Sequence, residues 1–143
     1  APATPELSLE RVKGVEFIVP NETELSLLSG MPVESLDDIS NAAHVLLNVG
    51  IKNVIVTLGA RGVLWISQED ERLIEASKVD AKDTTGAGDA FIGCFSHSWV
   101  KNGDIAEAIR VANVYAGDSV TRLGTQTSYA TAAEFEERTG ERV

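Results

Sequence analysis

The sequence predicts an α/β fold, with a mainly parallel sheet and flanking helices, on three observations. Short apolar runs of strand type alternate with segments whose apolar residues recur at helical spacing. Glycine-bearing turns separate these segments, as expected where strands and helices alternate along a chain. Sheets of this kind bind ligands at the carboxyl ends of their strands, and three glycine-bearing segments are expected at those ends. The fold class therefore already indicates where a site should lie.

The first half of the chain is predicted to contain two strands and two helices. In order, these are a strand at 15–19, a short helix at 22–29, a helix after Ser35 that ends at Gly50, and a strand at 53–58. Ser35 with Asp38 resembles a capping box, in which a side chain at each position accepts a backbone N–H of the other. The helix that follows carries its apolar residues at helical spacing, which predicts one buried face.

The second half is predicted to be mostly helical. Its expected elements are strands at 63–66 and 72–75, helices at 89–100 and 104–121, and a last short helix after Thr131. The helix at 89–100 is almost wholly apolar and is expected to be buried on all sides. Asp104 with Glu107, and Thr131 with Glu134, have the spacing of capping boxes.

Composition excludes several classes of function. The chain has 143 residues, of which 43% are hydrophobic and 24% charged, values typical of a single globular domain. Acidic residues outnumber basic ones by 22 to 12, which argues against nucleic-acid and anionic-membrane partners. No apolar run reaches the roughly 18 residues of a membrane-spanning helix. Cys94 is the single cysteine, so no internal disulfide can form, and a reducing, cytoplasmic location is expected.

The segment Gly86-Ala87-Gly88-Asp89 lies at the start of the apolar helix. The first backbone N–H groups of a helix have no internal partner, and small residues allow an anion to approach them. Asp89 is then either a helix cap or a functional carboxylate, and the residues alone leave both open. A Walker loop is excluded because no Lys follows the glycines, and a dinucleotide fingerprint because Phe91 stands where Gly or Ala is needed.

Four segments together resemble a known family. Residues 83–91, Asp-Thr-Thr-Gly-Ala-Gly-Asp-Ala-Phe, are similar to the C-terminal signature of the ribokinase-like (phosphofructokinase B) sugar kinases. Residues 20–24, 57–62 and 121–128 resemble the family's Asn-x-x-Glu motif, its nucleotide-binding turn and the stretch beside its ATP and cation sites. The resemblance covers essentially the whole chain. It implies a Rossmann-like ribokinase fold, of which residues 1–143 are the C-terminal nucleotide-binding half.

The resemblance assigns catalytic roles. Asp89 would be the base that accepts the proton of the sugar's primary hydroxyl. The N–H groups of Gly86, Ala87 and Gly88 would hold charge that develops on the transferred phosphoryl group. Asn21 and Glu24 would lie near the phosphates, with Glu24 holding Mg²⁺ through water. The alternative for this last pair is structural: Asn21 caps a helix and Glu24 is solvated.

The resemblance also implies two sets of binding residues, one for the nucleotide and one for a cation. The nucleotide would be lined by Asn21, Glu24, Thr57, Gly59, Ala60, Arg61, Gly62 and Gly88, with Asn113 beside the adenine. A monovalent cation such as K⁺ would be held by Asp83, the carbonyls of Thr85, Ser119, Arg122 and Gly124, and Ser128. Gly117 and Asp118 depart from the family pattern and are expected to fray their helix, which puts the cation site in question. His97, Cys94 and Trp65 are interpreted as structural residues.

The implied activity is transfer of the γ-phosphate of ATP to the primary 5-hydroxyl of a pentose, with ribose the first candidate. Alternatives are 2-deoxyribose and the substrates of fructokinase-like or ketodeoxygluconate kinase relatives. Family members are considerably longer, and the N-terminal half that supplies sugar contacts and a β lid has no counterpart here. We therefore expect a fragment of a longer kinase, homodimeric in full. A nucleotide-binding fragment without kinase activity of its own, or a non-kinase descendant of the fold, stays an alternative.

Overall fold

A four-stranded sheet, in the order β1-β2-β3-β4, organises the first half of the chain in the computed structural model, which describes residues 9–143. These residues divide into two compact units. The first contains the described residues up to Gly59 together with Val63–Leu73. The second contains Ala60–Gly62 and Ile74–Val143.

The sheet is mixed rather than mainly parallel. Its strands are β1 (Phe17–Ile18), β2 (Asn53–Thr57), β3 (Val63–Ser67) and β4 (Glu71–Ile74). β1 pairs with β2 in parallel, whereas β2 pairs with β3 antiparallel. Only the short 3-10 turn η2 (Gly59–Arg61) lies between β2 and β3. So short a connection makes a hairpin and cannot cross back to the start of a parallel strand. The α/β class was predicted correctly, but this strand direction was not.

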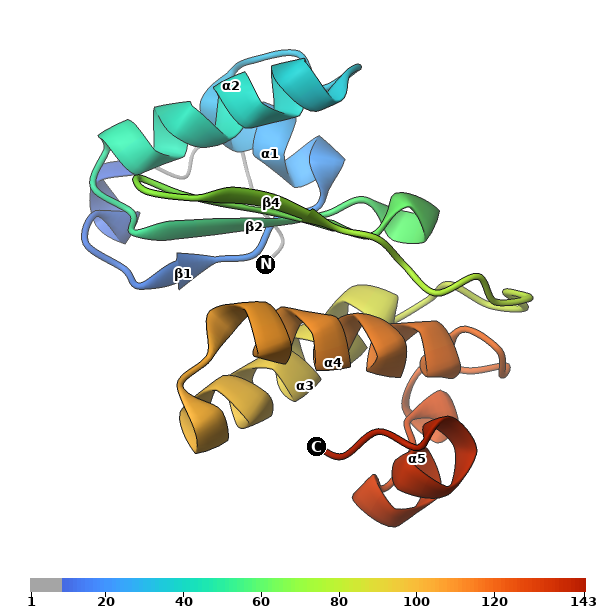
Figure 1. Cartoon of the computed structure of the whole chain (residues 1–143). Helices are drawn as coiled ribbons and strands as arrows, with labels where there is room; N and C mark the ends of the chain where they lie inside the picture. Colours follow the sequence, from blue (N-terminus) through green and yellow to red (C-terminus); the bar gives the residue numbers. More distant parts are fainter. Residues whose placement is uncertain (1–8) are drawn as a thin grey trace. The chain divides into compact units, whose positions relative to one another are not determined.

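Two helices, α1 (Glu22–Ser29) and α2 (Leu36–Asn48), cover one face of this sheet (Figure 1). Both begin with complete capping boxes, as the sequence predicted for the second. A short 3-10 helix, η1 (Leu9–Val12), precedes β1. The buried apolar residues form one cluster made of Leu25, Ile39, Ala42, Ala43, Leu46, Leu47, Ile51, Val54, Val56, Leu58, Leu64 and Ile66. This core holds the carboxyl ends of β1 and β2 beside the start of α1.

The second unit is built on a helical hairpin. Its elements are α3 (Ala87–Asn102), α4 (Ile105–Ser119), the 3-10 turn η3 (Gln126–Ser128) and α5 (Ala132–Thr139). α3 and α4 lie side by side (Figure 1), joined at Gly103, whose φ of 71° suits a glycine. Phe91 and Phe95 of α3, Ile109 of α4 and Phe135 of α5 are buried. No helix in the described residues is long and apolar enough to cross a membrane.

Three expectations for these helices need correction. α3 is buried on one face only, since Val100 is 78% exposed and Ile92 39% exposed. Its buried residues recur at the spacing of a single helical face, and glycine and polar residues occupy much of the rest. Asp104 caps α4 but the reciprocal half of the box is absent, because the carboxylate of Glu107 pairs with Arg110 instead. α4 also runs through Gly117 and Asp118 to Ser119 without fraying.

Candidate functional site

Gly86 sets the geometry at the start of α3. It is the N-cap residue, with φ 80° in the left-handed region, and no side chain caps the helix there. A Cβ at this position would lie 2.6 Å from the hydroxyl of Tyr129 and still closer to a methyl group of Thr125. Glycine is therefore required at residue 86 by the fold of the chain itself.

The N-terminal turn of α3 leaves backbone donors open. The N–H of Ala90 donates to the carbonyl of Gly86 at 2.9 Å, and the N–H of Ala87 donates to the carbonyl of Thr84 at 3.2 Å. Within the described residues, the N–H groups of Gly88 and Asp89 have no protein acceptor. Of the three predicted donors, Ala87 is thus already engaged. The N–H of Asp89 is an open donor that sequence reasoning missed.

Gly88 differs from Gly86 in what surrounds it. A Cβ at Gly88 would meet nothing within 4 Å, and its φ is not positive. Neither packing against the described residues nor backbone conformation therefore demands glycine here. A bound group that approaches the helix N-terminus closely would explain the small residue.

Asp89 is the third residue of α3 and is exposed. Its carboxylate makes no hydrogen bond or ion pair with any residue in the described part of the chain, so it does not cap α3. Loss of solvation is the main cause that raises the pKa of the Tyr129 hydroxyl, and the negative charge of Asp89 raises it further. A free carboxylate thus lies next to open N–H donors.

Asp83 ties the glycine loop to the segment after α4. One carboxylate oxygen accepts the N–H of Thr85 at 3.0 Å, and the other accepts the N–H of Gly124 at 3.0 Å. Hydrogen bonds from Thr85, and then from the Gly124 backbone, lower the pKa of Asp83 below its usual value. The backbone N–H of Asp83 also donates to the carbonyl of Val120 at 3.1 Å.

Arg122 joins the remaining residues of the predicted cation set. Its backbone N–H donates to the carbonyl of Ser119 at 3.3 Å, and its Nε donates to the carbonyl of Ser128 at 3.0 Å. Its guanidinium also pairs with Asp118 at 2.6 Å, and Arg138 approaches the same carboxylate at 3.4 Å. The six predicted residues therefore fall into two hydrogen-bonded groups, Asp83 with Thr85 and Gly124, and Arg122 with Ser119 and Ser128. The structure also gives Asp118, the departure from the family pattern, a role as the anchor of Arg122.

In the first unit, the structure brings Asn21, Glu24 and Thr57 together. Asn21 and Thr57 form a parallel β-bridge, and the N–H of Thr57 donates to the carbonyl of Pro20 at 3.0 Å. Asn21 Oδ1 accepts the N–H of Glu24, and Glu24 Oε2 accepts the N–H of Asn21, both at 2.9 Å. The capping alternative for Asn21 is thus confirmed. Glu24 belongs to the same cap, while its Oε1 has no partner within residues 9–143.

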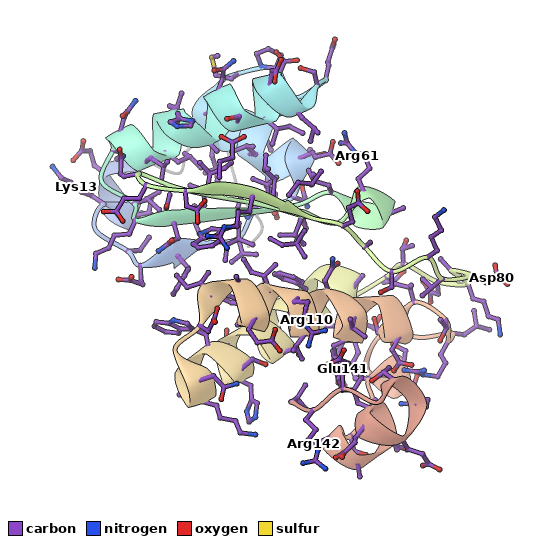
Figure 2. The ribbon with its side chains drawn as sticks, viewed as in Figure 1. Lys13, Arg61, Asp80, Arg110, Glu141 and Arg142 are labelled. Carbon is purple, nitrogen blue, oxygen red and sulfur yellow. The ribbon has the colours of Figure 1, made fainter. Side chains whose placement is uncertain are left out.

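Gly62 and Asn113 both contact the strand end at residues 74–76. Gly62 has φ 101°, and a Cβ there would lie 2.7 Å from the backbone nitrogen of Ala76. The side-chain amide of Asn113 donates to the carbonyl of Glu75 at 3.0 Å. Asn113 therefore has a structural bond, while its amide oxygen has no partner among the described residues. Gly59 and Ala60 are exposed on η2, and Arg61 extends from the same turn (Figure 2).

The described residues do not offer a ready divalent-metal centre made of side chains. No group of three or more His, Cys, Asp or Glu side chains converges within residues 9–143. A Mg²⁺ ion here would take most of its ligands from water and phosphate oxygens, as this ion commonly does. Cys94 is not a candidate nucleophile, because burial raises its pKa to about 11. His97 is exposed on α3 and belongs to no such group.

Comparison with known proteins adds a family to this geometry. The pattern of the pfkB family carbohydrate kinases matches residues 1–132. A deoxyribokinase of Salmonella typhi is 47% identical over 137 residues, which are 96% of this chain and 45% of the relative. The chain therefore spans less than half the length of this relative.

Two solved structures are also similar. A ribokinase of Arabidopsis thaliana, in complex with ribose and ATP, superposes with a TM-score of 0.85 at 31% identity. The match covers 91% of this chain and 42% of that one. A putative ribokinase II of Escherichia coli, in complex with ATP and Mg²⁺, gives a TM-score of 0.76 at 30% identity, covering 90% of this chain and 39% of that one.

Proposed function

Since the chain belongs to the pfkB family of carbohydrate kinases, we propose that it is the nucleotide-binding and catalytic half of an ATP-dependent pentose kinase. The observation that carries this proposal is the start of α3. Asp89, whose carboxylate has no partner among residues 9–143, lies there beside backbone N–H donors that the same residues leave open. A base next to an anion-binding helix end is what transfer of a phosphoryl group to a hydroxyl requires.

The residues of α3 have distinct tasks in this reaction. Asp89 accepts the proton that the primary hydroxyl of the sugar loses as its oxygen bonds to the γ-phosphorus. The bond from that phosphorus to the bridging oxygen breaks, and the electron pair leaves with ADP. The N–H groups of Gly88 and Asp89 stabilise the negative charge on the transferred group, a contribution typically worth ~10²–10³ in kcat per donor. Because Gly88 carries no side chain, those donors stay accessible.

We assign nucleotide contacts to the residues that follow the carboxyl end of β2 and, separately, to Gly62 and Asn113 of the second unit. Thr57 and Gly59–Arg61 follow the carboxyl end of β2, where ligands of α/β sheets bind. Gly62 and Asn113 meet at residues 74–76, and the free amide oxygen of Asn113 is the atom available to an adenine amino group. Mg²⁺ would supply charge neutralisation on the phosphates, with Glu24 Oε1 holding one of its waters.

The segment around Asp83 fits a monovalent cation. Carbonyl oxygens of a turn and one carboxylate are hard oxygen donors of the kind that K⁺ prefers. The hydrogen bonds of Asp83 and those of Arg122 hold the segments that carry these oxygens. We therefore expect the rate of the full-length enzyme to rise when K⁺ replaces Na⁺ at constant ionic strength. A flat response would remove the cation from the proposal and leave the hydrogen bonds of Asp83 and Arg122 to hold this loop.

Ribose and 2-deoxyribose are the two substrate candidates. The similarity to a ribokinase structure solved with ribose favours the first, and the higher identity to a deoxyribokinase favours the second. The test is a coupled ADP-release assay of the full-length protein with ATP and equal concentrations of ribose, 2-deoxyribose, fructose and adenosine. We expect turnover with one or both pentoses at well above the rate with the other two. Turnover with fructose or adenosine alone would refute the pentose assignment, and no turnover at all would refute the kinase.

A further inference from the structure

Tyr129 forms a contact that neither the sequence nor the family assignment singled out. Its hydroxyl donates to the carbonyl of Gly86 at 2.9 Å, across 43 residues of sequence. Gly86 is the N-cap of α3, and its carbonyl is the same one that accepts the first helical hydrogen bond, from Ala90. We propose that Tyr129 is a positioning residue of the phosphoryl-transfer site, acting through Gly86. The inference rests on the proposed kinase function.

The Gly86 carbonyl controls the orientation of the first peptide of α3. A peptide unit is planar, so fixing the carbonyl of Gly86 also fixes the N–H of Ala87. That plane leads directly into Gly88 and Asp89, which carry the open donors and the base. Gly86 has no side chain to restrict its backbone, and glycine adopts positive and negative φ about equally readily, so contacts from other residues can decide its conformation. The Tyr129 hydroxyl provides such a contact as a second donor to the Gly86 carbonyl, beside the N–H of Ala90.

Tyr129 is itself held in place. The carbonyl of the preceding residue, Ser128, accepts a hydrogen bond from the guanidinium of Arg122, which forms an ion pair with Asp118. Loss of solvation and the charge of Asp89 both raise the pKa of the Tyr129 hydroxyl. The hydroxyl therefore keeps its proton, and hence its ability to donate, throughout the neutral range. Tyr129 thus links the loop after α4 to the helix start that carries the chemistry.

The test uses the full-length protein with Tyr129→Phe, which deletes the hydroxyl oxygen and keeps the ring. Hydrogen exchange, followed by mass spectrometry, should be faster in the peptide covering residues 84–90 than in the wild type. With the preferred pentose, kcat should fall roughly ten-fold while both KM values stay within about two-fold, because only positioning in the transition state is lost. An unchanged exchange rate at 84–90, or an unchanged kcat, would overturn the inference.

Tyr115→Phe is the matched control. Tyr115 also donates its hydroxyl to a backbone carbonyl, that of Ala130, at 2.7 Å, but does not contact Gly86. We expect this variant to leave exchange at residues 84–90 and kcat at wild-type level. An equal effect of both variants would show general loosening of the loop and would refute a specific role for Tyr129. If the wild type lacks kinase activity, the proposed function fails, and the exchange experiment still decides whether Tyr129 holds Gly86.

Discussion

At the scale of single residues, two glycines two positions apart have different reasons to be glycine. Gly86 is confined by its positive φ and by Thr125 and Tyr129, so the fold requires it. Gly88 has open space among the described residues where a side chain would be, so the fold does not require glycine there. Both belong to the same motif in the sequence. Only their surroundings separate the structural glycine from the one that keeps the helix end accessible.

Replacing each glycine by Ala should therefore give opposite results. Gly86→Ala should destabilise the protein by about 2–4 kcal/mol, because it combines a left-handed backbone with a steric clash. Gly88→Ala should keep or slightly increase the free energy of unfolding, by up to about 1 kcal/mol, because Ala favours a helix. It should nevertheless lower kcat/KM by roughly ten-fold or more through obstruction of the phosphoryl group. Urea unfolding and steady-state kinetics of both variants check this, and a fully active Gly88→Ala enzyme would contradict it.

At the scale of elements, α4 is joined to the end of the chain through Arg110. Its Nε donates to Glu107 on the same helix at 2.8 Å, and its Nη1 donates to Glu141 at 2.7 Å. Figure 2 shows Arg110 and Glu141 directed toward each other. Hydrogen bonds from Arg110 lower the pKa of both carboxyl groups. The sequence did not reveal this link, because it predicted that Glu107 would serve in the helix cap.

The link predicts a pH-dependent contribution to stability. The carboxyl groups of Glu107 and Glu141 have lower pKa values in the folded state, so their stabilisation is fully present above their unfolded pKa. It is lost as the pH falls through the folded values. Arg110→Gln should cost up to about 1 kcal/mol of unfolding free energy at neutral pH, because the groups are partly exposed. The difference from wild type should shrink as the pH drops below about 4.

Arg142→Gln is the control for this prediction. Arg142 pairs with Glu136 at 2.7 Å, but its side chain is 82% exposed, so solvent screens the pair. Urea unfolding at several pH values should therefore show little change for this variant at any pH. An equal effect of Arg110→Gln and Arg142→Gln would mean that the Arg110 link is no more than a surface ion pair.

At the scale of the whole molecule, local patterns predicted most of the elements. The helix from Glu22 to Ser29 begins and ends as expected, because Asn21 and Gly30 are strong local signals for its two ends. The motif at the start of α3 was likewise identified from contiguous residues. The direction of β3 was not predicted, because it depends on how a short turn pairs two strands rather than on any apolar pattern.

Contacts between distant segments explain the other differences. The burial of α3 was overestimated because composition does not tell which face of a helix has a partner. Asp118 was expected to fray α4, yet it anchors Arg122, a partner four residues further along the chain. Tyr129 was overlooked because its partner, Gly86, lies 43 residues away. Pairings of this kind become visible only once the chain is folded.

Asp89 connects these scales, because its carboxylate has no protein partner in the described residues and, in the proposed reaction, would act as the base once sugar and ATP are bound. The most direct test is the steady-state kinetics of Asp89→Asn in the full-length protein, with the preferred pentose. Asn keeps the size of the side chain but removes the base. We predict that kcat falls by at least ~10² while the affinity for ATP, measured by calorimetry, stays within several-fold. Turnover near the wild-type rate would contradict the account, since Asp89 would then not be the base.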